Sequence, residues 1–140
     1  MLNQLLDDHR PLLEKCAESV PDRIELSALA AMLHGLYTGV ENILKRVVIE
    51  LDEGLPSGQR WHRALLDRMT RPGPDRPPVI SDALAESLTE YLAFRHFFRS
   101  AYPFVLQWER LEELVRGCAD TLGRLEDELD EFLRATGGRQ

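Results

Sequence analysis

The sequence contains no long hydrophobic run, few cysteines and no zinc-binding spacing. No apolar stretch approaches the roughly 18 residues that a membrane-spanning helix needs, so we expect no membrane association. The N-terminal stretch MLNQLLDDHR carries acidic residues where a secretory signal peptide has basic ones followed by an apolar run, which predicts a cytoplasmic protein. The two cysteines, Cys16 and Cys118, lie far apart and are expected to be reduced, partly buried thiols.

Motifs for metal, phosphate-loop and serine-hydrolase chemistry are also missing. The 4 histidines are dispersed and form no HExxH or similar spacing, so no metal site is expected. Gly54, Gly58 and Gly73 are isolated turn glycines and do not form a loop that could cradle a phosphate. No Gly-x-Ser-x-Gly elbow is present. The sequence therefore predicts no bound cofactor.

Charge is distributed unevenly along the chain. The 17 basic and 24 acidic residues give a net charge of -7, which argues against a protein that coats nucleic acid by bulk charge. The segment 59–76 nevertheless holds five arginines against two aspartates. Between Glu90 and Glu109 there is no acid, yet Arg95, His96 and Arg99 lie there. This acid-free window is the first indication of an anion site.

Helical periodicity dominates a chain of 140 residues, which is the length of one domain, residues 1–140. The fold class predicted is all-α, an up-and-down four-helix bundle with one additional short helix. The first expected helix begins at about Leu2, with a kink or late start near Pro11. Ser81 is expected to be the N-cap of the fourth helix. The other expected helices cover about Glu25–Leu51, Gln59–Met69, Ser81–Ala101 and Gln107–Leu133.

Two further features bear on packing. Gly35 and Gly39 lie four residues apart inside the long second helix, where each costs about 1 kcal/mol relative to alanine. We therefore expect another helix to pack closely against them. Residues 71–78 include four prolines and a glycine and cannot form regular structure.

The segment Tyr91–Trp108, YLAFRHFFRSAYPFVLQW, concentrates polar groups at one end of one helix. At helical spacing, Arg95, Arg99 and Tyr102 form one stripe, and His96 and Ser100 form a second stripe beside it. Arginines four residues apart repel each other by a few tenths of a kcal/mol, and a bound phosphate would relieve that cost.

A purely structural explanation of this segment remains open. The arginines can pair with acids from another helix, for instance Glu41 or Glu109. His96 would then be a surface histidine, and Tyr102 would anchor the end of the helix.

The same residues resemble the signature of HepT-like toxin domains of the HEPN superfamily. In that signature four residues separate an arginine from a histidine, and one residue separates the histidine from a tyrosine. Arg95 and Tyr102 fit its ends. The resemblance covers about Leu26 to Leu133. It also includes the long second helix with Tyr37, Glu41, Asn42 and Lys45, the Pro56-Ser57-Gly58 turn, the Trp61-His62 pair and the block FRHFFRSAY.

The resemblance implies metal-independent RNA cleavage in a cleft shared by two chains of a homodimer. The arginine would stabilise the negative charge of the phosphate, and the histidine would transfer a proton. The position expected to hold histidine is Ser100, whose hydroxyl has no pKa near neutrality. His96, one turn earlier, is the local substitute. The resemblance places Glu41, Asn42, Lys45 and His62 as residues flanking the cleft, although for His62 the favoured interpretation is an ordinary histidine at the edge of the core.

The resemblance also implies a partner. HepT-like toxins are commonly neutralised by a small nucleotidyltransferase antitoxin that attaches AMP to the motif tyrosine, which is Tyr102 here. Such a group would add bulk and negative charge beside Arg95 and Arg99. Three interpretations thus stand: a ribonuclease toxin, a non-catalytic HEPN domain that binds nucleotide, RNA or a partner protein, and a structural bundle without a ligand.

Overall fold

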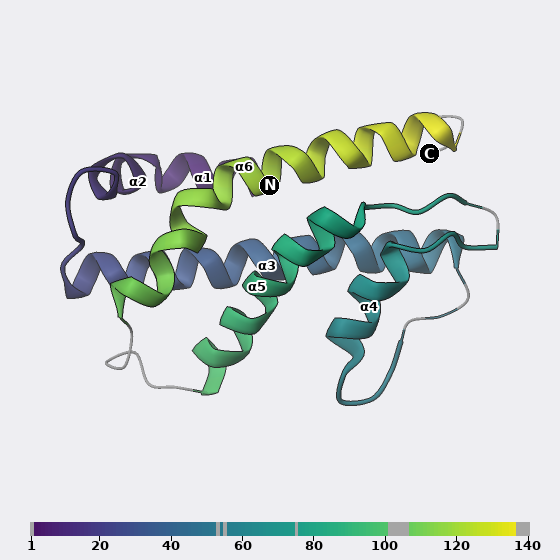
Figure 1. Cartoon of the computed structure of the whole chain (residues 1–140), viewed down its shortest axis with the longest axis horizontal. Helices are drawn as coiled ribbons and strands as arrows, with labels where there is room; N and C mark the ends of the chain where they lie inside the picture. The colour runs from purple at the N-terminus through teal and green to yellow at the C-terminus, as the bar shows by residue number, and fades with distance from the viewer. Residues whose placement is uncertain (1, 53, 55, 75, 101–106, 137–140) are drawn as a thin grey trace. The chain divides into compact units, whose positions relative to one another are not determined.

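The computed structural model describes residues 2–52, 54, 56–74, 76–100 and 107–136, with Leu2 and residues 97–100 described by their backbone alone (Figure 1). Over these residues the chain is helical, and its β-structure is limited to one isolated bridge between Gly73 and Arg76. The predicted all-α fold is confirmed. The helices are α1 (Leu2–Asp8), α2 (Arg10–Cys16), α3 (Arg23–Leu51), α4 (Trp61–Met69), α5 (Asp82–Ser100) and α6 (Trp108–Ala135).

The chain divides into two compact units. The first unit comprises residues 1–40 and 90–119, and the second comprises residues 41–89 and 120–140. The long helices α3, α5 and α6 each contribute one segment to either unit. Each unit is described separately below.

The first unit buries one face of α1 and α2 together with segments of α3, α5 and α6. Gly35 allows a close approach, because a Cβ atom at this position would lie 3.2 Å from Cδ2 of Leu5. The close packing predicted from the glycine spacing is therefore present at Gly35. The buried side chains include Leu6, Cys16, Leu29, Leu33, Leu36, Phe94, Trp108, Leu111, Val115 and Cys118.

The second unit packs α4 against segments of α3, α5 and α6. Ser81 caps α5 as predicted, since its Oγ accepts a hydrogen bond from the Leu84 amide at 3.1 Å. Glu128 on α6 accepts hydrogen bonds from both the amide and the hydroxyl of Ser81, at 2.7 and 2.9 Å. The buried side chains include Leu44, Val48, Leu65, Leu66, Met69, Leu84, Leu88, Leu122, Leu125 and Phe132.

The helix boundaries agree closely with expectation. The interruption predicted near Pro11 is present as a break at His9 between two seven-residue helices. Pro11 explains the break, because it has no N–H to continue the ladder of α1 but is tolerated in the first turn of α2. α4 begins at Trp61, two residues later than predicted. α5 is described to Ser100, and the predicted end at Ala101 lies outside the described residues.

Candidate functional site

The predicted site residues fall partly within the described structure. Arg95 and His96 lie on α5 in the first unit, where Arg95 is half-buried and His96 is exposed. Arg99 and Ser100 continue α5, but their side chains lie outside what the structure describes. Tyr102 lies outside the described residues altogether.

The position of Arg95 is fixed by the residues that precede it on α5. The Tyr91 hydroxyl, one turn earlier, donates a buried hydrogen bond of 2.8 Å to the backbone carbonyl of Leu114 on α6. Phe94, adjacent in sequence, is buried with 6% of its surface exposed. These anchors hold α5 against α6 within the first unit and place the Arg95 side chain at the edge of the core.

Arg95 carries an unsatisfied polar atom. Its Nε is buried and has no hydrogen-bond partner among the described residues. An unpaired buried donor costs about 1–3 kcal/mol, and more when the group is charged. None of the ion pairs within the described part of the chain includes Arg95 or Glu109. A bound anion would satisfy this donor.

Glu41, which the sequence offered as a partner for the arginines, is engaged by a histidine. Its side chain is buried, and Oε2 lies 2.5 Å from Nδ1 of His62. This contact turns the Nδ1 side of the His62 ring toward the Glu41 carboxyl group. The buried Glu41 thus sets the orientation of a half-buried imidazole in the second unit.

Two further side chains complete the Glu41 cluster, which consists of Glu41, Lys45, Trp61 and His62. The Trp61 and His62 rings have centroids 3.8 Å apart, and Nζ of Lys45 lies 5.0 Å from the Trp61 ring centroid. The structure therefore brings together three of the four residues predicted to flank a cleft. The fourth, Asn42, is exposed on α3.

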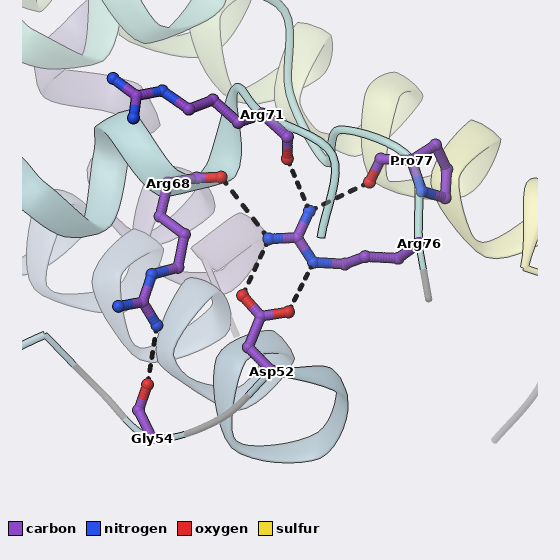
Figure 2. Close-up of polar contacts among 6 residues, drawn as sticks. All are labelled: Asp52, Gly54, Arg68, Arg71, Arg76 and Pro77. Atoms are coloured by element: carbon purple, nitrogen blue, oxygen red, sulfur yellow. Dashed lines mark hydrogen bonds and ion pairs between the residues drawn. The ribbon is translucent and has the colours of Figure 1, made fainter. Parts of the chain in front are cut away.

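Sequence reasoning missed a buried ion pair between Arg76 and Asp52, whose side chains are 1% and 6% exposed. Arg76 donates from Nε to Oδ1 of Asp52 at 2.8 Å and from Nη2 to Oδ2 at 2.9 Å (Figure 2). The remaining donors reach the backbone carbonyls of Arg71, Pro77 and Arg68, at 3.0, 3.0 and 3.5 Å. Neither the 24-residue separation nor the proline-rich context signals this pair in the sequence.

Metal and thiol chemistry find no support in the described residues. Over these residues no group of three or more His, Cys, Asp or Glu side chains could hold a metal ion. Cys16 and Cys118 are free and buried, as predicted, and burial raises the pKa of both thiols, which makes them poor nucleophiles. Within the same residues, no helix combines the length and apolar character needed to cross a bilayer.

Comparison with known proteins identifies the family. A family model described as "HepT-like protein" matches residues 28–136. No curated protein and no solved structure matches the chain significantly. The matched segment contains α4, α5 and α6 in full and most of α3, and it includes both Arg95 and the Glu41 cluster. The chain therefore belongs to the HepT-like protein family.

Proposed function

We propose that this protein is a metal-independent endoribonuclease toxin of a toxin–antitoxin pair, with Arg95 as the residue that binds the scissile phosphate. The observation that carries the proposal is the buried Nε of Arg95, which has no partner among the described residues. It lies on α5 within the acid-free window, in a chain of the HepT-like family. A guanidinium held at the edge of a core without a carboxylate is suited to a phosphate ligand.

The reaction requires charge stabilisation and proton transfer. The ribose 2′-hydroxyl attacks the adjacent phosphorus, the bond from phosphorus to the 5′-oxygen breaks, and a 2′,3′-cyclic phosphate forms. Negative charge develops on the phosphoryl oxygens, where Arg95 would donate hydrogen bonds. His96 would take the proton of the attacking hydroxyl, and water would donate a proton to the departing 5′-oxygen, which leaves as a hydroxyl. The base is His96 because Ser100 occupies the position of the motif histidine and cannot titrate near neutrality.

The assembly and regulation follow from the family resemblance. We infer a homodimer whose two copies of Arg95, His96, Arg99 and Tyr102 share one cleft. A nucleotidyltransferase antitoxin would attach AMP to Tyr102, and the added negative charge would occupy the arginines in place of RNA. A cytoplasmic location is consistent with an RNA substrate.

Ser100 favours a second candidate function. A HEPN domain without the motif imidazole could bind RNA, a nucleotide or a partner protein without cleaving anything. Arg95 would still bind phosphate in that case. The two functions differ in product formation, not in binding, so a cleavage assay separates them.

The test uses end-labelled RNA in EDTA with the parent, Arg95→Ala, His96→Ala and Ser100→His. We expect cleavage by the parent, a loss of about a hundredfold or more in Arg95→Ala, a comparable loss in His96→Ala, and a gain in Ser100→His. Arg46→Ala is the matched control, since this arginine is 80% exposed and pairs only loosely with Glu50 at 3.6 Å.

The outcomes separate the two functions. RNA binding without any cleavage, in a parent shown by mass spectrometry to carry no AMP, would replace the ribonuclease proposal with the binding function. Equal activity in Arg95→Ala and Arg46→Ala would remove Arg95 from the site.

A further inference from the structure

The second unit contains a pocket that the proposed active site does not use. It has a volume of about 470 Å³ and lies between the end of α3, α4 and the proline-rich loop that follows α4. Its floor and walls combine charged and apolar groups. The lining residues are Asp52, Ala64, Asp67, Arg68, Arg71, Pro72, Gly73, Pro74 and Arg76.

The charges in this pocket do not cancel. Both oxygens of Asp52 are occupied by Arg76, so that pair is neutral. Asp67 also lines the pocket, and Nε of Arg63, outside the lining, lies 3.8 Å from it. Three arginines and two aspartates therefore give the lining one net positive charge.

The two remaining guanidinium groups are available at the surface. Arg68 donates one hydrogen bond, of 2.7 Å, to the backbone carbonyl of Gly54, which satisfies a donor but does not neutralise the charge. Arg71 is exposed, and its side chain extends away from the Arg76 guanidinium while its carbonyl turns toward it (Figure 2). The pocket thus carries a net positive charge in a chain whose net charge is -7.

The pocket wall is held rigid from within. Arg76 binds the carbonyls of Arg71, Pro77 and Arg68, and its own carbonyl accepts from the Gly73 amide at 2.9 Å. A Cβ atom at position 73 would lie 2.8 Å from Nε of Arg76, so this approach requires glycine. A preorganised loop loses little conformational entropy when a ligand binds.

We propose that this pocket is a phosphate-binding subsite for RNA, in which Arg68 and Arg71 each contact a backbone phosphate and the two prolines, Pro72 and Pro74, contact a sugar or base. The planar guanidinium fork matches phosphate oxygens. Apolar walls beside arginines suit a nucleotide, which presents a charged group and a flat ring together. The inference rests on the proposed function for the identity of the ligand as RNA, but it concerns residues separate from Arg95.

The experiment measures binding apart from cleavage. A fluorescein-labelled, 2′-O-methyl single-stranded RNA lacks the attacking hydroxyl, so fluorescence anisotropy reports only association. Dissociation constants are measured across a series of salt concentrations for the parent, Arg71→Gln, Arg68→Gln and the double variant. Glutamine removes the charge but keeps a polar side chain, and neither substitution touches the backbone carbonyls that bind Arg76. Arg46→Gln removes the same charge elsewhere in the second unit.

We expect each pocket variant to weaken binding about tenfold, the loss of one hydrogen bond to a charged group. The slope of log K against log salt should fall by about 0.7 for each arginine, the value for one phosphate contact on a single strand. Arg46→Gln should leave affinity and slope unchanged. Thermal unfolding of each variant checks that the fold is intact.

Two results would overturn the subsite. The first is a double variant that binds RNA with the parent's affinity and slope. The second is a polyglutamate peptide that competes as well as RNA of equal charge, which would show that the pocket recognises charge and not a nucleotide.

The failures of the two proposals are distinguishable. If the parent cleaves unmodified RNA but the pocket variants bind normally, only the subsite is wrong. If the parent binds 2′-O-methyl RNA through Arg68 and Arg71 but never cleaves unmodified RNA, the ribonuclease proposal fails and the subsite stands.

Discussion

Two arginines, one in each unit, differ in how their buried donors are satisfied. Arg76 is almost fully buried and uses all of its donors, with a bidentate carboxylate and three carbonyls around it. Arg95 is half-buried, and its buried Nε has no partner among the described residues. The first arrangement holds a loop in place. The second leaves hydrogen-bonding capacity that a ligand can use.

The difference teaches how to interpret a buried guanidinium. A group with every donor satisfied adds little to binding, because its ligand set is already complete. A group with an orphaned donor lowers stability until something binds to it, and sites of this kind are where function is expected. Arg68 and Arg71, beside Arg76, differ from it in another way, because their guanidinium groups are accessible to solvent and do not hold the loop together.

The largest expected effect comes from removing the partner of Arg76. Asp52→Ala leaves a buried charge unpaired and should lower the free energy of unfolding by about 3–5 kcal/mol. Arg95→Met should leave stability unchanged or slightly raised, because it removes an unsatisfied donor. Urea unfolding of both variants measures the contrast. Equal losses of unfolding free energy in Asp52→Ala and Arg95→Met would show that the two arginines do not differ in this way.

Glu41 offers an intermediate case, since it is buried and hydrogen-bonds to the half-buried His62. His62→Ala should lower the free energy of unfolding by about 1.5–3 kcal/mol, because a buried carboxylate loses a charged hydrogen bond. In a Glu41→Gln background His62→Ala should lower the free energy of unfolding by less, because glutamine leaves no buried charge without a partner. A double-mutant cycle measures the coupling, and a coupling near zero would show that the contact does not stabilise the second unit.

The smallest effect concerns acid sensitivity. The hydrogen bonds from Arg76 hold the pKa of Asp52 below its ordinary value, even though partial burial opposes the shift. A lowered folded-state pKa contributes stability that is present above the unfolded pKa of about 3.9 and is lost as pH falls through the folded pKa. The free energy of unfolding of Asp52→Asn should therefore fall less than that of the parent as the pH is lowered. Arg95→Met, with no carboxylate partner, should follow the parent's pH profile, and parallel profiles for all three proteins would contradict the assignment.

Local signals in the sequence predicted most of the fold. The Ser81 cap, the break near Pro11 and the close approach at Gly35 each depend on residues within a few positions or on one residue's lack of a side chain. α3 and α6 were placed within two residues of their observed ends because long apolar stripes define them.

The site was less predictable because its contacts join distant segments. Asp52 and Arg76 are 24 residues apart and lie in stretches that the sequence identifies only as a loop and a proline-rich segment. The sequence grouped Glu41 with His62 through family resemblance but did not indicate that they form a pair, since 21 residues separate them. Ser100 was the reverse case, where the sequence alone identifies the departure from the family signature.

The most direct test of the account is RNA cleavage in EDTA by the parent and Arg95→Met, with both proteins shown to be equally stable by urea unfolding. The account predicts that the parent cleaves and that Arg95→Met loses about a hundredfold or more of the rate without losing stability. A folded Arg95→Met variant that cleaves RNA at the parent's rate would contradict it.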